Sequence, residues 1–298
     1  MIAAALAAPH AVESGRSLTL ADGDRYAAWV HGANVRVLDE ETERTSSVPM
    51  PADCREPDAL GGGKLVFTCG KDWRELRLLD VATLTWSAVP SSDAVKAMFE
   101  NAVSVERIGS VWIAAMVETV DDRILHPMWI EHATGRVVAE DPGDITQYPD
   151  LDAPELWAPL CPPLRRLPSQ TWTPEEPSGL RWIPPDVKGT RALDTLGGRM
   201  LLRFCGTAMT RWVTRELIYS SMSFSGNRVT WTDTRWIRDG AAVRETVRTL
   251  DVTTGRVRSW AFGNRPELHV VHTRRHIFVD HERAAEHVQR FAIDLSQR

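Results

Sequence analysis

Residues 251–257 read DVTTGRV, and a turn of the same form occurs three more times along the chain. The other copies are DEETERT from Asp39, DVATLTW from Asp80 and EHATGRV from Glu131. Each copy follows a stretch of alternating apolar and polar residues, and a second strand-like stretch comes after it. Asp and Thr side chains bond to the backbone in tight turns and Gly permits a positive φ, so each copy predicts a hairpin between two strands.

A further strand precedes each of these hairpins, and six such strands are visible in the sequence. They start 38, 47, 89, 28 and 48 residues apart. A unit of about 40 to 50 residues with four short strands is typical of a propeller blade, so the sequence predicts an all-β fold with a single β-propeller. The six strands are residues 26–31, 64–69, 111–116, 200–205, 228–232 and 276–280.

The repeated motifs resemble those of WD40-like and TolB-type β-propellers from bacterial secreted and periplasmic proteins. The resemblance rests on the D-x-x-T-G turns and on DGDRYAAW at residues 22–29, and it covers most of the chain outside residues 141–190. It implies a propeller fold and an exported protein. It points to no single defined activity.

The longest spacing between strands contains a proline-rich segment. Eleven of the 18 prolines lie between Pro142 and Pro185. Because proline cannot donate to a strand ladder, we expect residues 141–190 to be an insertion rather than a blade. Six blades are then expected, with five to seven possible, and the propeller spans residues 17–298.

The two ends of the chain suggest how the sheets are completed. The last unit stops one strand short, after FAIDL at residues 291–295. We therefore expect Ser17–Leu20 to join the sheet that contains residues 286–295, because this leaves no open edge. Residues 1–13 are small and apolar at first, which predicts a residual signal peptide or a disordered leader.

Four cysteines fit two disulfides, which favours an oxidising compartment. DALGGGKLVFTCG at residues 58–70 predicts a hairpin tip. If Gly61 and Gly62 form the turn, counting outward places Cys54 opposite Cys69. We therefore predict a disulfide between them.

A second copy of this hairpin, DTLGGRMLLRFCG at residues 194–206, matches the first at seven of thirteen positions. The same count places Thr190, which is not a cysteine, opposite Cys205. We expect Cys161 to return from the proline-rich segment and pair with Cys205. Four buried free thiols are the alternative.

Charge and composition exclude several classes of partner. The 298 residues carry 35 Lys and Arg against 40 Asp and Glu, a net charge of −5. Nucleic acid and anionic membranes select a basic face, so neither is expected as a partner. No stretch approaches the 18 apolar residues of a membrane span. We expect a monomer that binds no cofactor.

Three of the 12 tryptophans are candidate ligand contacts, because Trp157, Trp172 and Trp182 fall within the proline-rich segment. They either pin this segment to the propeller or stack on a sugar or peptide. The late histidines His269 and His272 are three apart and point to opposite faces of a strand, so no metal site is predicted.

Two functional hypotheses follow. The first is a secreted or periplasmic propeller that binds a protein or a glycan through one face. The alternative is a propeller enzyme, a lyase or hydrolase, acting at the mouth of the central channel. Two or more converging His, Asp or Glu side chains in a polar cavity would favour the enzyme.

Overall fold

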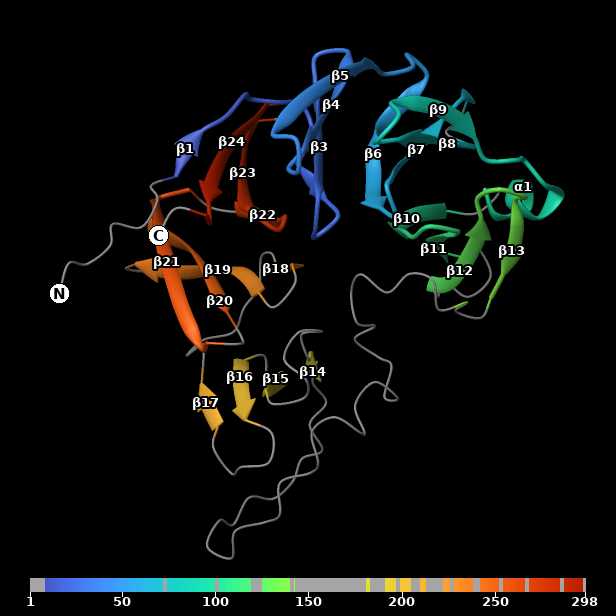
Figure 1. Cartoon of the computed structure of the whole chain (residues 1–298). Coiled ribbons are helices and arrows are strands. Elements are labelled where there is room, and N and C mark those ends of the chain that lie inside the picture. Colours follow the sequence, from blue (N-terminus) through green and yellow to red (C-terminus); the bar gives the residue numbers. More distant parts are fainter. Residues whose placement is uncertain are drawn as a thin grey trace, which may run out of the picture. The chain divides into compact units, whose positions relative to one another are not determined.

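The structure is a computed structural model, and the chain has an all-β fold with the blade organisation of a β-propeller (Figure 1). The strands among the described residues form six four-stranded sheets. Within the described part of the chain, no helix is long and apolar enough to cross a bilayer. The structure describes residues 9–71, 74–99, 102–118, 125–139, 142, 181–182, 191–196, 199–204, 210–212, 222–225, 228–237, 242–251, 254–265, 268–284 and 287–296.

Three sheets follow one another in the first half of the chain, each an antiparallel meander. The first contains β2 (Leu20–Ala21), β3 (Tyr26–His31), β4 (Asn34–Asp39) and β5 (Arg44–Pro49). The second contains β6 (Cys54–Gly61), β7 (Lys64–Cys69), β8 (Glu75–Asp80) and β9 (Thr85–Ala88). The third contains β10 (Ala102–Ile108), β11 (Trp112–Glu118), β12 (Leu125–Glu131) and β13 (Arg136–Val138).

The remaining three sheets lie in the second half of the chain, and the last one includes a strand from its start. The fourth contains β14 (Arg181–Trp182), β15 (Arg191–Leu196), β16 (Arg199–Phe204) and β17 (Thr210–Trp212). The fifth contains β18 (Met222–Ser225), β19 (Arg228–Ile237), β20 (Ala242–Asp251) and β21 (Arg256–Gly263). The sixth contains β22 (Leu268–His272), β23 (His276–Ala284), β24 (His287–Asp294) and β1 (His10–Ala11).

The four acidic turns each join the last two strands of a sheet, which confirms the predicted hairpins. The carboxylate of Asp80 accepts hydrogen bonds from the backbone N–H groups of Ala82 and Thr83 and from the Thr83 hydroxyl. The backbone has a positive φ four residues after every acid, and only two of these positions are glycine. They are Glu43 (56°), Leu84 (58°), Gly135 (70°) and Gly255 (69°). The acid and the threonine therefore define the turn, with or without glycine.

The first of these turns predicts a pH-dependent stability. Arg25 donates two hydrogen bonds of 2.7 Å to Asp39 and lowers the pKa of this carboxyl from 3.8 to about 2. Because the folded state binds the proton less tightly, the pair stabilises the fold fully above about pH 3.8 and loses this effect as the pH falls toward 2. We expect Asp39→Asn to lower the free energy of unfolding at pH 6 by about 1 kcal/mol or less, and the melting temperature slightly, since the pair is partly exposed. Melting curves between pH 2 and 7 should converge at the acid end, and a constant difference would contradict this origin.

The sixth sheet is completed by the beginning of the chain, since β1 pairs antiparallel with β24. Gly15 and Val288 then exchange two backbone hydrogen bonds, of 3.0 and 2.9 Å. Strand pairing thus begins before residue 13, the expected end of the leader. Residues 1–8, where the signal peptide is expected, lie outside the described residues.

The expectation that Ser17–Leu20 completes this sheet is wrong, because β1 does so. Ser17–Leu20 does not pair with residues 286–295. Instead, Leu20 faces Ala28 of β3 in the first sheet. Of this segment only Leu20 lies in a strand, β2, so the strand expected over residues 17–20 is also too long. Side-chain alternation does not specify which neighbouring edge the backbone bonds to.

A buried arginine ties the N-terminal strap, residues 13–19, to β24. Arg290 is fully buried, and its Nε donates to the hydroxyl of Thr19. Its other two nitrogens donate to the backbone carbonyls of Glu13 at 3.1 Å and Ser17 at 2.9 Å. The guanidinium also stacks over the ring of Trp29, 4.9 Å from the ring centroid. One side chain thus holds two segments that are far apart in the sequence.

The chain forms two compact units. One comprises Glu13–Gln147 and Glu282–Arg290, and the other comprises Met1–Val12, Tyr148–His281 and Phe291–Arg298. Each unit has apolar clusters of its own between successive sheets, as expected when a single sheet cannot bury both faces alone.

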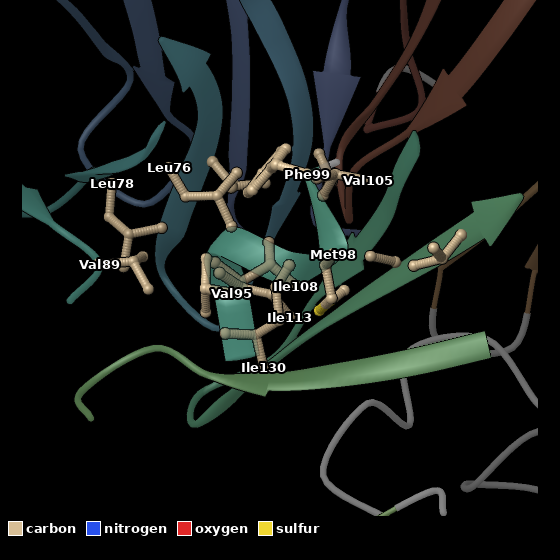
Figure 2. Packing of buried hydrophobic residues seen from close by; sticks show 14 residues of the cluster. Leu76, Leu78, Val89, Val95, Met98, Phe99, Val105, Ile108, Ile113 and Ile130 are labelled. Atoms are coloured by element: carbon tan, nitrogen blue, oxygen red, sulfur yellow. The ribbon is translucent and has the colours of Figure 1, made fainter. Parts of the chain in front are cut away.

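The apolar cluster between the second and third sheets is organised around helix α1 (Asp93–Met98) (Figure 2). Ser92 begins the helix, where its hydroxyl oxygen accepts the N–H of Val95 at 3.1 Å. Val95 and Met98 point inward from the helix. They pack with Leu76 and Leu78 of β8, Val105 and Ile108 of β10, Ile113 of β11 and Ile130 of β12.

Two further clusters lie between neighbouring sheets. One joins the first and second sheets and includes both disulfide cysteines, with Leu65 and Leu79 fully buried. The other joins the fifth and sixth sheets within the second unit. It contains Val247, Trp260 and Phe262 from the fifth sheet and Leu268, Val270, Ile277, Val279, Ile293 and Leu295 from or beside the sixth.

The second copy of the glycine hairpin occupies a different place in its sheet. Residues 194–206 contribute to β15 and β16, which are the second and third strands, because β14 pairs with β15 before them. The first copy supplies the first and second strands instead. Since β14 falls within residues 141–190, the end of the expected insertion belongs to a sheet. A two-residue strand is too short to be recognised from alternation.

The tip of the first glycine hairpin allows a stability prediction with its own control. Gly62 and Gly63 both have positive φ, at 53° and 74°. A Cβ on Gly62 would overlap the backbone of Gly109 and Ser110, whereas one on Gly63 would meet nothing within 4 Å. Gly62→Ala should therefore destabilise the protein by about 3 kcal/mol, and Gly63→Ala by about 1 kcal/mol. Urea unfolding of the two variants measures the difference, and equal losses would contradict the close approach.

Candidate functional site

A cleft of about 810 Å³ lies beside the start of β6. Its walls are the turn at residues 32–33, the segment at residues 50–52 and the strand at residues 54–58, with Arg16 of the strap. All of these belong to one compact unit. The volume is within the range of about 300 to 1,000 Å³ that is usual for ligand pockets.

The strand on one side of the cleft is irregular in a way that displays its side chains. β6 pairs with β7 at Cys54↔Cys69, Pro57↔Phe67 and Ala59↔Val66, so it carries one extra residue in each of the two intervals. Such bulges turn a strand and re-aim its side chains, and they are common next to functional sites. Arg55 and Glu56 fall in the first bulge and line the cleft.

The bulges also explain how the predicted cysteine pair arises. The disulfide between Cys54 and Cys69 is confirmed. The turn assumed in that prediction is wrong, however, because Gly61 pairs with Lys64 and the turn residues are Gly62 and Gly63. A regular ladder from this turn would place Cys54 opposite residue 71. The two extra residues of β6 shift the register by two and restore the pairing with Cys69.

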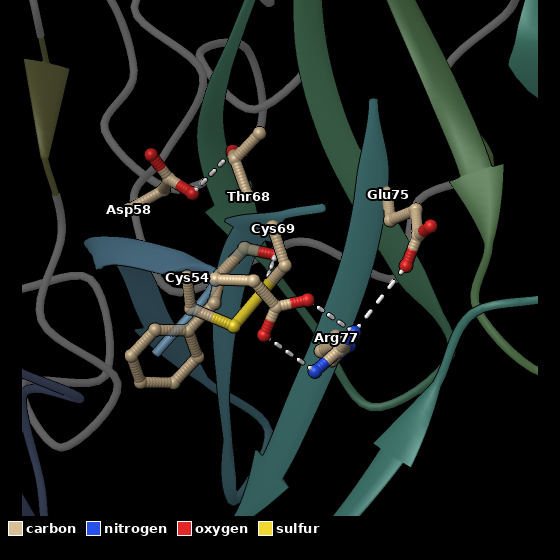
Figure 3. Close-up of a disulfide and its surroundings, with 8 residues drawn as sticks. Cys54, Asp58, Thr68, Cys69, Glu75 and Arg77 are labelled. Atoms are coloured by element: carbon tan, nitrogen blue, oxygen red, sulfur yellow. Dashed lines mark hydrogen bonds and ion pairs between the residues drawn. A yellow bond between two sulfur atoms is a disulfide. The ribbon is translucent and has the colours of Figure 1, made fainter. Parts of the chain in front are cut away.

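Several contacts fix the end of β6 at the cleft (Figure 3). Beside the disulfide, Arg77 of β8 donates to both carboxylate oxygens of Asp53, at 3.1 and 2.7 Å. The N–H of Gly70 donates to the carbonyl of Asp53 at 2.8 Å, and the N–H of Cys54 donates to the carbonyl of Pro51 at 3.1 Å. The wall of the cleft is therefore preorganised by a covalent bond, a bidentate ion pair and backbone hydrogen bonds.

The charged groups of the cleft come from both of its sides. Arg16 of the strap lies 3.4 Å from Glu56 of β6, measured from Nε to Oε1. Both side chains keep about two fifths of their surface exposed, at 35% and 43%. Arg16 is held in place through its backbone, since its N–H donates to the carbonyl of Val30 at 2.9 Å. Arg55 is exposed beside them.

The second bulge contains a carboxylic acid with a perturbed proton affinity. The hydroxyl of Thr68 donates to Asp58 at 2.7 Å, which replaces part of the ladder lost at the bulge. Burial raises the pKa of Asp58, whereas the hydrogen bonds from Thr68 and the charge of Arg55 oppose this rise. The nearby charge of Glu106 adds to it. The cleft thus contains two guanidinium groups, one carboxylate and one carboxyl group that holds its proton more tightly than usual.

Of the described residues that the sequence singles out, Cys54 is the one that lines the cleft. Trp157, Trp172, Cys161 and Cys205 are outside the described residues, so the second disulfide and the proposed ligand contacts stay predictions. The backbone of Trp182 belongs to β14, where it pairs with Leu193. In the part of the chain that the structure describes, no group of three His, Cys, Asp or Glu could hold a metal ion.

Sequence reasoning missed the four charged residues of the cleft. The available signal is Pro57, which stands inside a stretch that otherwise has to pair with β7. Because proline lacks the N–H of a ladder partner, it marks an edge strand or a bulge. Charged residues on both sides of such a proline are candidates for display toward solvent.

Comparison with known proteins does not assign this chain to a protein family. No protein-family model and no curated protein matches the chain. Among solved structures, a calcium-binding protein, regucalcin, from Agrobacterium tumefaciens is 12% identical, with a TM-score of 0.39 over 97% of this chain and 93% of that one. The β-propeller domain of the Trilobed protease from Pyrococcus furiosus is 9% identical, with a TM-score of 0.38 over 98% and 94%. The all-β fold is instead evident from the six four-stranded sheets of the described residues.

Proposed function

We propose that this protein is a binding module of the secreted or periplasmic space, and that it takes a protein or glycan ligand in the cleft beside β6. The observation that carries this proposal is the preorganised display of Arg55 and Glu56 opposite Arg16. Irregular, polar backbone that is held rigid by a disulfide is costly to maintain and suits recognition better than packing.

The disulfide supports the proposed location outside the cytoplasm. Cys54 and Cys69 are buried at 5% and 0% exposure, and they form part of the apolar cluster between the first two sheets. Disulfides of this structural kind persist in oxidising compartments and are rare in the cytosol of most organisms. We further propose that the protein acts as a monomer.

The proposal is tested by screening the full chain against a glycan array and against pools of random peptides. The wild-type protein is compared with Arg16→Gln, Arg55→Gln and Glu56→Gln. Lys96→Gln is the matched control, because it removes an exposed charge on α1 that pairs with Asp93 at 3.4 Å, outside the cleft. We expect ligands that bind the wild type and the control but lose affinity for at least one cleft variant. Ligands that bind all variants equally would show that the cleft is not the binding site.

A second candidate function is catalysis in the same cleft, and one observation favours it. The pKa of Asp58 is raised, as a general acid requires, and Glu106 is close enough to contribute to this rise. A lyase or hydrolase would then cleave a ligand that the screens identify. Asp58→Asn should abolish such turnover while binding persists. Unchanged turnover in this variant would remove Asp58 from the mechanism.

A further inference from the structure

The composition of the cleft narrows the class of ligand that the proposed binding function would serve. Among the described residues that line it, none is aromatic. Sugar rings usually bind by stacking an apolar face on an aromatic side chain, which these walls do not offer. The apolar lining consists of small or flexible residues, Met50, Pro51, Ala52 and Pro57, which suit the aliphatic parts of a peptide.

The charged groups of the cleft already have partners within the protein, Arg55 included. Glu56 already contacts Arg16, and Asp58 already accepts from Thr68. A guanidinium has five N–H donors, more than one carboxylate engages, and the cleft has two such groups. The hydrogen-bonding capacity that remains in the cleft is therefore for a ligand group that accepts hydrogen bonds. Planar carboxylates are such groups, and they match guanidinium groups in geometry and charge.

The two arginines come from different segments, the strap and the first bulge of β6, and the contacts around the disulfide keep the bulge in place. This arrangement lets two guanidinium groups approach one ligand without a prior rearrangement.

From these observations, and on the basis of the proposed binding function, we infer that the ligand is a polypeptide segment that presents a carboxylate to Arg16 and Arg55. The carboxylate comes from an Asp or Glu side chain or from a free C-terminus. Pro57 and residues 50–52 contact the aliphatic portion of the same segment. Glu56 holds Arg16 in position and is not itself a ligand contact.

The test uses the full chain and defined pools of fluorescent hexapeptides. The pools are acidic, basic or neutral, and each is made with a free or an amidated C-terminus. Anisotropy titration should show that the acidic pools bind, and that Arg16→Gln and Arg55→Gln each weaken this binding about tenfold. Lys96→Gln should have no effect. Thermal melts of each variant confirm that it is folded, and Arg55 is exposed, so its replacement leaves the core intact.

The arms of the titration separate the two sources of the carboxylate. Binding of the amidated acidic pool indicates a side-chain carboxylate, whereas binding of the neutral pool that is lost on amidation indicates the C-terminus. A preference for the basic pools, equal binding by the arginine variants, or binding of no pool overturns the inference. If glycans bind the cleft and no peptide pool does, the binding function stands and the peptide ligand is rejected.

Discussion

Replacing Arg290 with alanine should lower the free energy of unfolding by about 4 kcal/mol, the largest effect expected for a single substitution here. The change removes three hydrogen bonds from a charged donor, and the carbonyls of Glu13 and Ser17 lose this donor. It also removes the guanidinium from the ring of Trp29. Because only the backbone hydrogen bonds between Gly15 and Val288 then hold the strap to β24, we expect early cleavage of the N-terminus by proteases as well as a lower urea midpoint.

A second arginine provides the control for this prediction. Arg265 also stacks over an aromatic ring, Phe291 at 5.2 Å, and donates to one carbonyl, that of Phe262. It is partly exposed and does not hold the strap. Arg265→Ala should therefore cost only about 1 kcal/mol. If both substitutions cost the same and the N-terminus stays protected in Arg290→Ala, the strap is held by its backbone pairing alone.

The paired substitution of Cys54 and Cys69 by alanine should destabilise the protein by about 3 kcal/mol. The bond closes a loop with a sequence separation of 15 residues, and a loop of that length gives this value in the chain-entropy treatment. Removal of the disulfide should also loosen the wall of the cleft, because the first bulge of β6 lies directly after Cys54. We expect trypsin to cleave after Arg55 much faster in the alanine pair than in the wild type at a temperature where both are folded.

Gly63→Ala controls for general destabilisation, since it weakens the same hairpin at its opposite end. Faster cleavage after Arg55 in that variant too would mean that loss of stability, and not loss of the anchor, exposes the bulge. A cleavage rate equal to that of the wild type in the alanine pair would show that Asp53 and Arg77 suffice to hold the wall.

The sequence predicts features of this protein that depend on local chemistry. The acidic turns are recognisable because the carboxylates of Asp39, Asp80 and Asp251 accept hydrogen bonds from backbone N–H groups two or three residues later. The repetition of these turns indicates the hairpins of the successive sheets. The pairing of strands that are far apart in the sequence is harder to predict. Ser17–Leu20 looks like a strand, but its partner edge depends on backbone geometry and on a buried arginine from the other end of the chain.

The cleft illustrates the same limit. The predicted pairing of Cys54 with Cys69 is correct. It results, however, from a turn one residue further along the chain and from two bulges, which cannot be found by counting residues outward from the turn. Those bulges are also what places Arg55 and Glu56 in the cleft. Apart from Pro57, nothing in the local sequence distinguishes these charged residues from others on the surface of the protein.

The most direct test of the proposed binding site is a hydrogen-exchange footprint of the full chain. The ligand is the peptide or glycan that binds most tightly in the screens, added at saturation. If the ligand binds in the cleft, we expect slower exchange for the amides at residues 32–33 and 50–58, including Arg55 and Glu56 in the first bulge of β6. Protection confined to other segments, with exchange at these residues unchanged, would contradict it.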